Sequence, residues 1–413
     1  MKKTLRSLLA LVLSLCMVLG MAGAVFAKET QENELSQLLT EIQSLMNKYG
    51  PEIDPAATAG YRVGTGVKLD ADALSYYVAI GDASVQRQKG TTKAYPTLLA
   101  EALDIDCEIL YEKEILIEAA SEELIAPNAA EIQKADLVTI GFSVNGFALV
   151  ALDEVLRDPG EASYLDWSLY LPEEGVAEVK DTLARMEKYL KETGMDNSYG
   201  FGDTKFNVAE ALVAAAESFA FGTMAYANHL PKVVDQIHEL NPDATVMVVG
   251  MDNPMEGATV KLSSGETMDL GDYVAKLIGF TGRISQTVAI QKANTVYVPI
   301  SHAANTNDGQ EIKDVQMITM YMPQNLYKCY PNDQGHAYIA GHLQGAMYLA
   351  GDINNDGEVT YLDAMDALQA SVGLMKLNAA QIYVCDTDYD DEVTYLDAME
   401  ILRAAVGLVP MNK

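Results

Sequence analysis

The sequence is poor in positive charge, cysteine and histidine, and each shortage excludes a class of function. Among 413 residues there are 28 Lys and Arg against 59 Asp and Glu, which gives a formal net charge of −31. A chain this acidic repels nucleic acid and anionic membrane, so neither is expected as a partner. Four cysteines are too few for a disulfide framework. No Cys or His cluster has the spacing of a zinc site, and no glycine-rich phosphate loop is present.

Long apolar segments are also scarce, and the one at the N-terminus is typical of export. A basic start is followed by an apolar stretch over 8–18 and by Ala24-Val25-Phe26-Ala27, which has small residues at −3 and −1 for cleavage after Ala27. This pattern predicts a secretory signal peptide over 1–27. A membrane anchor fits less well because the run is short and contains glycine, and no later segment is apolar enough to span a bilayer. We therefore expect a secreted, extracellular protein.

The octapeptide Glu-Val-Thr-Tyr-Leu-Asp-Ala-Met occurs twice, at 358–365 and 392–399, and each copy completes a 12-residue string of oxygen donors. Side-chain oxygens at loop positions 1, 3 and 5, a backbone carbonyl at 7 and a carboxylate at 12 form the cage that Ca²⁺ prefers. The sequence therefore predicts two Ca²⁺ ions as cofactors. Their ligands would be Asp352, Asn354, Asp356, Glu358 and Asp363 in the first loop, and Asp386, Asp388, Asp390, Glu392 and Asp397 in the second.

The residues around each loop refine this prediction. Gly357 at position 6 allows the sharp turn of the first loop, whereas Asp391 occupies that position in the second and tolerates a left-handed turn less well. Acidic surface turns are the alternative, since Asp and Asn favour turns, but the duplication of both spacing and flanks argues against them. Helical apolar spacing follows each loop, and no entering helix is evident before either. We therefore expect loop–helix units rather than complete helix–loop–helix hands.

Over 349–413 this pattern resembles a type I dockerin, the module that attaches proteins to cohesin domains of a cellulosomal scaffoldin. The resemblance implies a small all-α calcium-binding domain, on a cellulosome that is free or held at a cell surface. In that family, loop positions 10 and 11 help to select the cohesin. Here they are Tyr361-Leu362 and Tyr395-Leu396, identical in both halves. The resemblance therefore implies two docking orientations related by a twofold turn.

Before this tail, short apolar runs alternate with helical patterns. Strands are expected at 76–80, 108–111, 137–142, 245–250 and 295–300, and helices at 33–48, 95–103, 207–221, 228–240 and 335–348. Buried strands that alternate with helices predict an α/β fold, in which helices cover both faces of a parallel sheet. Residues 28–69 are expected to form an N-terminal helical extension. Residues 151–206 interrupt the alternation and are expected to be an insertion near the carboxyl edge of the sheet.

Four segments of the body, within about 70–348, resemble the SGNH (GDSL) hydrolases, a family of esterases and acylhydrolases. They are 77–82, 95–103, 135–147 and 330–340. The resemblance implies a three-layer α/β/α sheet. In active members a Ser after the first strand attacks an ester, a His near the C-terminus takes its proton, an Asp three residues earlier orients the His, and an Asn stabilises the oxyanion.

Most of that machinery is replaced when the roles are carried over position by position. Ala83 stands in the place of the nucleophile, Tyr330 in that of the His and Tyr327 in that of the Asp, whereas Asn145 matches the oxyanion Asn. Without a hydroxyl and a base there is no general-base route to an acyl-enzyme. We therefore expect a non-catalytic body that acts in the binding or degradation of plant cell-wall polysaccharide.

An active carbohydrate esterase is the alternative, with Ser84 as a displaced nucleophile. It lies one residue past the expected place and would need a base, for which His302 after the fifth strand is the candidate. Ser at such a place more often caps a helix, and a lone loop His is more often a polar surface group. The helical histidines His229, His238 and His342 are expected on solvated faces.

Overall fold

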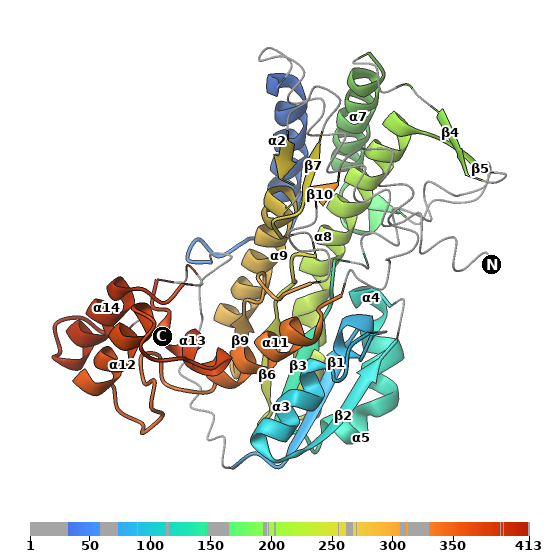
Figure 1. Cartoon of the computed structure of the whole chain (residues 1–413). Helices are drawn as coiled ribbons and strands as arrows, with labels where there is room; N and C mark the ends of the chain where they lie inside the picture. Colours follow the sequence, from blue (N-terminus) through green and yellow to red (C-terminus); the bar gives the residue numbers. More distant parts are fainter. Residues whose placement is uncertain are drawn as a thin grey trace.

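A computed structural model describes most of the chain (Figure 1). The described residues are 32–57, 73–88, 90–112, 115–144, 146, 165–192, 196, 198–201, 204–254, 256–261, 267–269, 271–305, 311–312, 330–388, 390 and 392–411. No helix within these ranges is both long and apolar enough to cross a membrane.

The centre of the body is a five-stranded sheet in the order β2-β1-β3-β6-β9, in which every pairing is parallel. Its strands are β1 (Tyr76–Gly81), β2 (Asp106–Tyr111), β3 (Leu137–Gly141), β6 (Thr245–Val249) and β9 (Thr295–Val298). The order is that of a doubly wound sheet, which places the switch point between β1 and β3. All five strand predictions are confirmed to within two residues at each end.

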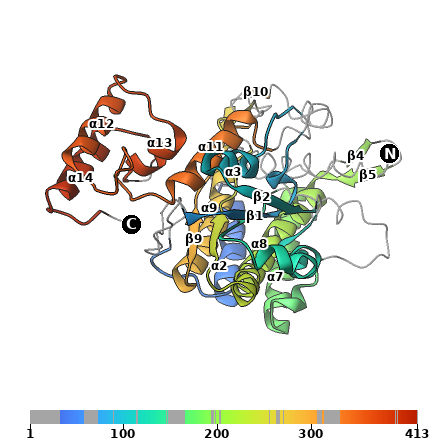
Figure 2. The same cartoon turned by 90° about the horizontal axis from the view of Figure 1, so that it is seen from below.

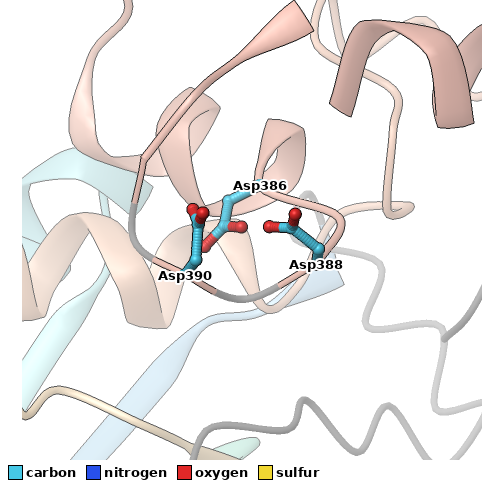
Figure 3. A group of neighbouring side chains, drawn as sticks. All are labelled: Asp386, Asp388 and Asp390. Atoms are coloured by element: carbon cyan, nitrogen blue, oxygen red, sulfur yellow. The ribbon is translucent and has the colours of Figure 1, made fainter. Parts of the chain in front are cut away.

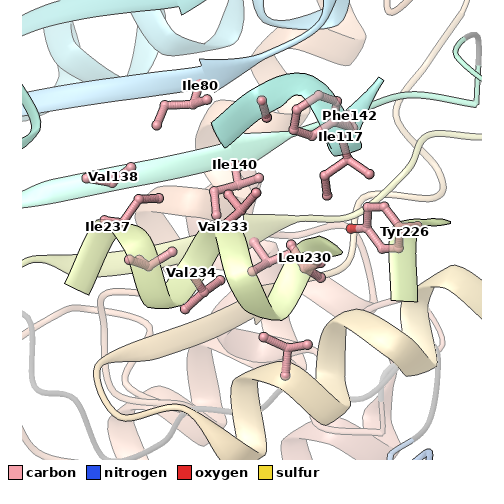
Figure 4. Packing of buried hydrophobic residues seen from close by; sticks show 14 of the residues in the cluster. Ile80, Ile117, Val138, Ile140, Phe142, Tyr226, Leu230, Val233, Val234 and Ile237 are labelled. Atoms are coloured by element: carbon pink, nitrogen blue, oxygen red, sulfur yellow. The ribbon is translucent and has the colours of Figure 1, made fainter. Parts of the chain in front are cut away.

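Each strand buries alternate side chains on opposite faces of the sheet. One face, with Val78, Val138 and Val246, packs on α4 (Ile117–Ala120), α5 (Ala129–Ile132), α8 (Val208–Leu240) and α9 (Gly271–Gln291), as Figure 4 shows in part. The other face, with Tyr77, Leu137 and Met247, packs on α3 (Tyr95–Leu103) and α11 (Asp333–Gly345). The expected three-layer α/β/α architecture is therefore confirmed.

A second hydrophobic core lies among helices beyond the sheet. Helix α2 (Glu32–Tyr49) packs against α7 (Glu173–Leu190) and the first half of α8, around Met186 and Trp167. The N-terminal extension and the insertion therefore pack together, and Lys48 pairs with Glu178, 130 positions away in the chain. Because α8 runs antiparallel to the strands, its beginning lies on the side of their carboxyl ends, where the insertion was expected.

The long helix α8 corrects one prediction. It is one helix of 33 residues, about 50 Å long, with Pro231 inside it, whereas separate helices were expected at 207–221 and 228–240. Met224, Ala225 and Tyr226 between those ranges are buried, because this part of α8 passes between the two cores. A helix buried all round shows no polar face, so its pattern does not resemble that of a surface helix. Helix α9 was not predicted either.

Smaller elements complete the body. They are the hairpin β4 (Ser198–Phe201) and β5 (Thr204–Asn207), the three-stranded sheet β10 (Glu311–Ile312), β7 (Thr259–Lys261) and β8 (Thr267–Asp269), and the short helical segments η2 (Ala83–Val85), η3 (Ser121–Ile125), η4 (Ala126–Asn128) and η5 (Trp167–Leu169).

The C-terminal tail contains α12 (Tyr361–Ser371), α13 (Ala379–Cys385) and α14 (Tyr395–Ala405), which lie to one side of the body in both views (Figures 1 and 2). Helices α12 and α14 pack on each other around Ala367 and Ile401. Helix α13 ends directly at the second acidic loop, with Asp386 as its C-cap. The expectation that no helix enters this loop is wrong, because a helix of seven residues is too short to show a periodic pattern.

Substitution of Met186 by Ala tests the second core. The Met186 side chain is fully buried, so its truncation leaves a cavity and should lower the free energy of unfolding by about 2–5 kcal/mol. The exposed Lys180 on the same helix is the control, and Lys180→Ala should change stability by less than about 0.5 kcal/mol. The single Trp167 lies in this core, so its fluorescence in urea reports the transition directly. Coincident transitions of the two variants would contradict the assignment.

Candidate functional site

The Asp82 carboxylate holds the carboxyl ends of β1 and β3 together. One carboxylate oxygen accepts a hydrogen bond from the Ser84 N–H at 2.8 Å and thereby caps η2. The other accepts the N–H of Ser143 at 2.9 Å and its hydroxyl at 2.7 Å. The two strands approach closely here, because a Cβ on Gly81 would overlap the carbonyl oxygen of Gly141. The turn that presents residues 83 and 84 is therefore fixed from two sides.

Ser84 lies at this turn, buried against a small cavity at the carboxyl edge of the sheet. The cavity has a volume of about 10 Å³ and is lined by Ser84, Tyr95, Gly141, Phe142, Val249, Gly250, Asp252, Ile300, Pro331 and Ile339. Such a volume holds about one water molecule. Attack on an ester requires space for the acyl carbon and for donors to the oxyanion. The described residues leave no such space beside Ser84.

His302 occupies a different environment from Ser84. Its side chain is 47 % exposed, and Nδ1 contacts the carboxylate of Glu256. It does not line the cavity beside Ser84. Among the described residues no hydrogen bond joins Ser84 to His302, so the structure does not bring the alternative catalytic pair together.

Of the other four positions that match the catalytic residues of the SGNH family, the structure describes Ala83 and Tyr330. Ala83 is buried at the start of η2, and Tyr330 lies half-buried just before Pro331 and α11. Asn145 and Tyr327 lie outside the described residues, so their predicted places are untested.

Asp252 is a cavity residue that the sequence analysis did not single out. It is buried, lies three residues past β6, and accepts a hydrogen bond from the Asn305 side-chain amide at 3.1 Å. The sequence signal was an acid two residues after the glycine that ends a buried strand, at the edge where the sites of such sheets form.

His336 is buried between α3 and α11 and is kept neutral. Its Nδ1 accepts the backbone N–H of Tyr95 at 3.2 Å, and the two rings stack. Burial lowers the pKa of His336 to about 4, an effect that Asp333 opposes only in part. Because Nδ1 accepts a hydrogen bond and the ring is neutral, the proton is on Nε2. His336 therefore joins two helices and does not face the cavity as a base.

The expectation for the other helical histidines was wrong. His342 is 4 % exposed and lies between Tyr338 and Tyr383, at ring-centroid distances of 3.7 and 4.9 Å. His229 and His238 are half-buried, and burial lowers the pKa of each. His229 Nε2 lies 3.3 Å from the Tyr170 hydroxyl and His342 packs on Tyr383, and the patterns of their own helices do not reveal these partners.

The first acidic loop of the tail is folded around its own carboxylates. Asp352 is buried and accepts the N–H groups of Asp356 and Gly357 at 3.1 and 2.7 Å. Asp363 accepts the N–H of Ile353 at 3.0 Å with one oxygen and that of Thr360 at 2.8 Å with the other. Gly357 has a φ of +89°, so its predicted role in the sharp turn is confirmed.

The second loop gathers Asp386, Asp388 and Asp390 (Figure 3). Carboxylate oxygens of the three lie within 4.8 Å of one another. Oxygens bound to one Ca²⁺ at about 2.4 Å lie no more than about 5 Å apart, so this donor set fits the ion. Burial, followed by repulsion from the Asp397 and Asp390 carboxylates, raises the pKa of Asp388, and a cation would relieve that repulsion. Asp391 lies outside the described residues.

Helices α12 and α14, together with the residues that directly follow them, expose a matched set of apolar side chains. Tyr361 and Tyr395 are each 60 % exposed. The exposed pairs, each separated by 34 positions, are Tyr361 and Tyr395, Leu362 and Leu396, Met365 and Met399, Leu368 and Leu402, Val372 and Val406, and Leu374 and Leu408. We call these residues the paired apolar face. An apolar set of this extent at a protein surface is typical of a protein-binding site.

No protein-family model and no curated protein matches the chain. Solved structures similar to it include a lipase from a goat rumen metagenome, at 13 % identity and a TM-score of 0.35, over 66 % of this chain and 97 % of the other. Phospholipase A1 from Streptomyces albidoflavus is 16 % identical with a TM-score of 0.30, over 62 % of this chain and 100 % of the other. A GDSL-like lipase from Parabacteroides merdae is 12 % identical with a TM-score of 0.30, over 66 % of this chain and 95 % of the other. At these values the likeness carries no argument about activity, and the fold class rests on the sheet order and its layers.

The free energy of unfolding should decrease as the pH is lowered, because His336 is buried in its neutral form. Between its ordinary pKa of 6.5 and its folded pKa of about 4, the unfolded chain takes up a proton that the folded chain refuses. Its contribution, up to about 3 kcal/mol, is therefore complete above pH 6.5 and is lost as the pH falls to 4. The variant His336→Gln lacks this dependence, so the stability gap between it and the native chain should narrow between pH 7 and pH 4 in urea unfolding. Parallel curves would contradict the buried neutral state.

Proposed function

We propose that this protein is a secreted cellulosome component, in which a type I dockerin over 349–413 binds a cohesin domain of a scaffoldin. The paired apolar face carries the proposal. Its members occupy equivalent positions in the two halves, on the helices that begin within the identical octapeptides and directly after them, so the two halves offer one partner the same residues twice. Tyr361, Leu362, Tyr395 and Leu396 would be the selecting residues.

Calcium is proposed as the cofactor that shapes this face. Asp363 and Asp397 each lie at loop position 12 and also accept from the N-cap threonine at the start of α12 or α14. An ion bound by these loops would therefore orient the helices that carry the apolar side chains. The carboxylate repulsion at Asp388 is removed in the same step.

For the body we propose an SGNH-hydrolase-like domain that has lost ester hydrolysis and acts in the binding or degradation of plant cell-wall polysaccharide. Two observations support the loss. The cavity beside Ser84 has room for about one water molecule, and His302 is bound to Glu256 away from that cavity. Attachment to a scaffold would hold such a domain near its polysaccharide by raising its effective concentration.

An active carbohydrate esterase stays as the second candidate, because the cavity that Ser84 lines also contains the Asp252 carboxylate. A fluorophosphonate probe and an acetyl ester test it, with Ser84→Ala as the matched control. We expect neither labelling nor hydrolysis above the level of the Ser84→Ala variant. Labelling and turnover that vanish in Ser84→Ala would establish the esterase instead.

Substitution of Asp388 by Asn tests the calcium site. Asp388 lies at loop position 3, where the side chain is the ligand, so loss of its charge should weaken Ca²⁺ binding by about tenfold or more. Glu392 in the same loop is the control, because position 7 binds through its backbone carbonyl. Glu392→Gln removes one charge as well and should leave the affinity within about twofold of the native value. Calorimetric titration with Ca²⁺ measures both, and equal affinities in the two variants would exclude the proposed cage.

A further inference from the structure

We propose that α13 couples the second calcium loop to the body, so that Ca²⁺ binding locks α13 onto α11 and stabilises the body. The dockerin is in this view a rigid continuation of the α/β domain. The inference rests on the proposed function only in requiring that the second loop binds Ca²⁺.

On the body side, two glycines of α11, Gly341 and Gly345, lie against α13. A Cβ on Gly341 would overlap the Cβ of Ala379, and one on Gly345 would lie 2.7 Å from the Ala380 carbonyl oxygen. Both glycines lie on one side of α11, four residues apart, and they allow the backbones of the two helices to approach closely. Glycine is unfavourable inside a helix, so two on the contact side are explained by this approach.

Aromatic stacking anchors the same contact. Tyr383 of α13 is 4 % exposed and belongs to the core on the α3–α11 face of the sheet, together with Leu343 and Met347. Its ring meets that of His342 at 4.9 Å between centroids and 64° between planes. His342 in turn packs on Tyr338. A residue of the tail therefore fills part of the core of the body.

The opposite side of α13 belongs to the tail. Cys385 is fully buried with Ile353, Ala367 and Ile401 in the small core of the calcium-binding module. The Gln381 side chain donates to the Ile353 carbonyl of the first loop at 3.2 Å. Helix α13 is thus shared between two cores, and neither core is complete without it.

The end of α13 is the beginning of the second loop. Asp386, the ligand at loop position 1, is the C-cap of α13, and its N–H donates to the Ile382 carbonyl at 2.9 Å. An ion that fixes the position of Asp386 would therefore also fix the last turn of α13. From there the contact reaches α11, whose Ile339 lines the cavity beside Ser84. Ca²⁺ would accordingly stabilise the helix that closes one side of the body's cavity.

Hydrogen exchange on the full chain tests this coupling, with Ca²⁺ alone as the probe. At a Ca²⁺ concentration about 100 times its Kd, exchange of the α11 and α13 amides should slow by up to about 100-fold relative to excess chelator. At the same concentration the variant Asp388→Asn, whose affinity is expected to be about tenfold lower or weaker still, should show at least about tenfold less protection. Helix α7 lies in the second hydrophobic core, with α2 and the first half of α8, and the exchange rates of its amides should not depend on Ca²⁺.

The variant Gly341→Leu tests the contact between α11 and α13 independently of Ca²⁺ binding. Leu favours the helix more than Gly, so α11 alone would gain stability, but the side chain excludes α13. We expect this variant to bind Ca²⁺ by calorimetry and to lose at least tenfold of the calcium-induced protection in α11. Ala337 is exposed on α11, and Ala337→Gly, the control, should retain that protection. If Gly341→Leu does not fold, Asp388→Asn still decides the question with the interface intact.

The outcomes distinguish this inference from the proposed function. Native chain that binds no Ca²⁺ removes the dockerin proposal and this inference with it. Native chain that binds Ca²⁺ while α11 exchanges at the same rate with and without the ion overturns the coupling alone. Calcium-dependent protection of α11 that persists in Gly341→Leu would overturn the assigned route through α13.

Discussion

Burial of the central sheet on both faces is the constraint from which the rest of the arrangement follows. Five parallel strands expose apolar side chains in both directions, and water must be excluded from each face. Helices α8 and α9 cover one face. Helices α3 and α11 cover the other, where Tyr383 from the tail completes the layer. The module that resembles a dockerin is thereby held to the body by the same hydrophobic burial that forms the sheet.

The carboxyl edge of the sheet is where this fold places chemistry, and here side chains fill it. Asp82 fixes the turn after β1, and the strands are close enough that only glycine fits at position 81. Phe142, Ile300 and Tyr95 occupy the space beyond, so that the cavity beside Ser84 is about 10 Å³. The cavity at this edge is therefore smaller than the space that an ester substrate would need.

The two acidic loops of the tail illustrate how much of a structure is local. Thr360 with Asp363 and Thr394 with Asp397 form the same capping box, with the same pattern of accepted N–H groups, at a separation of 34 residues. The surroundings nevertheless differ, since α13 leads directly into the second loop alone. The identical octapeptides therefore form the same capping box, while only the second loop directly follows a helix that contacts the body.

The sequence by itself determined the five strands, the order of the layers and the two acidic loops, because these depend on alternation of apolar residues and on contacts between neighbours in the chain. Tertiary structure alone decided that α8 is continuous, that α2 packs on α7, that His342 is buried and that the described residues Ser84 and His302 share no hydrogen bond. Each of these depends on side chains distant in sequence, such as Glu41 and Arg185, which pair across the two helices. Periodicity reports which side of an element is apolar, whereas the neighbour that covers it is chosen only when the whole chain packs.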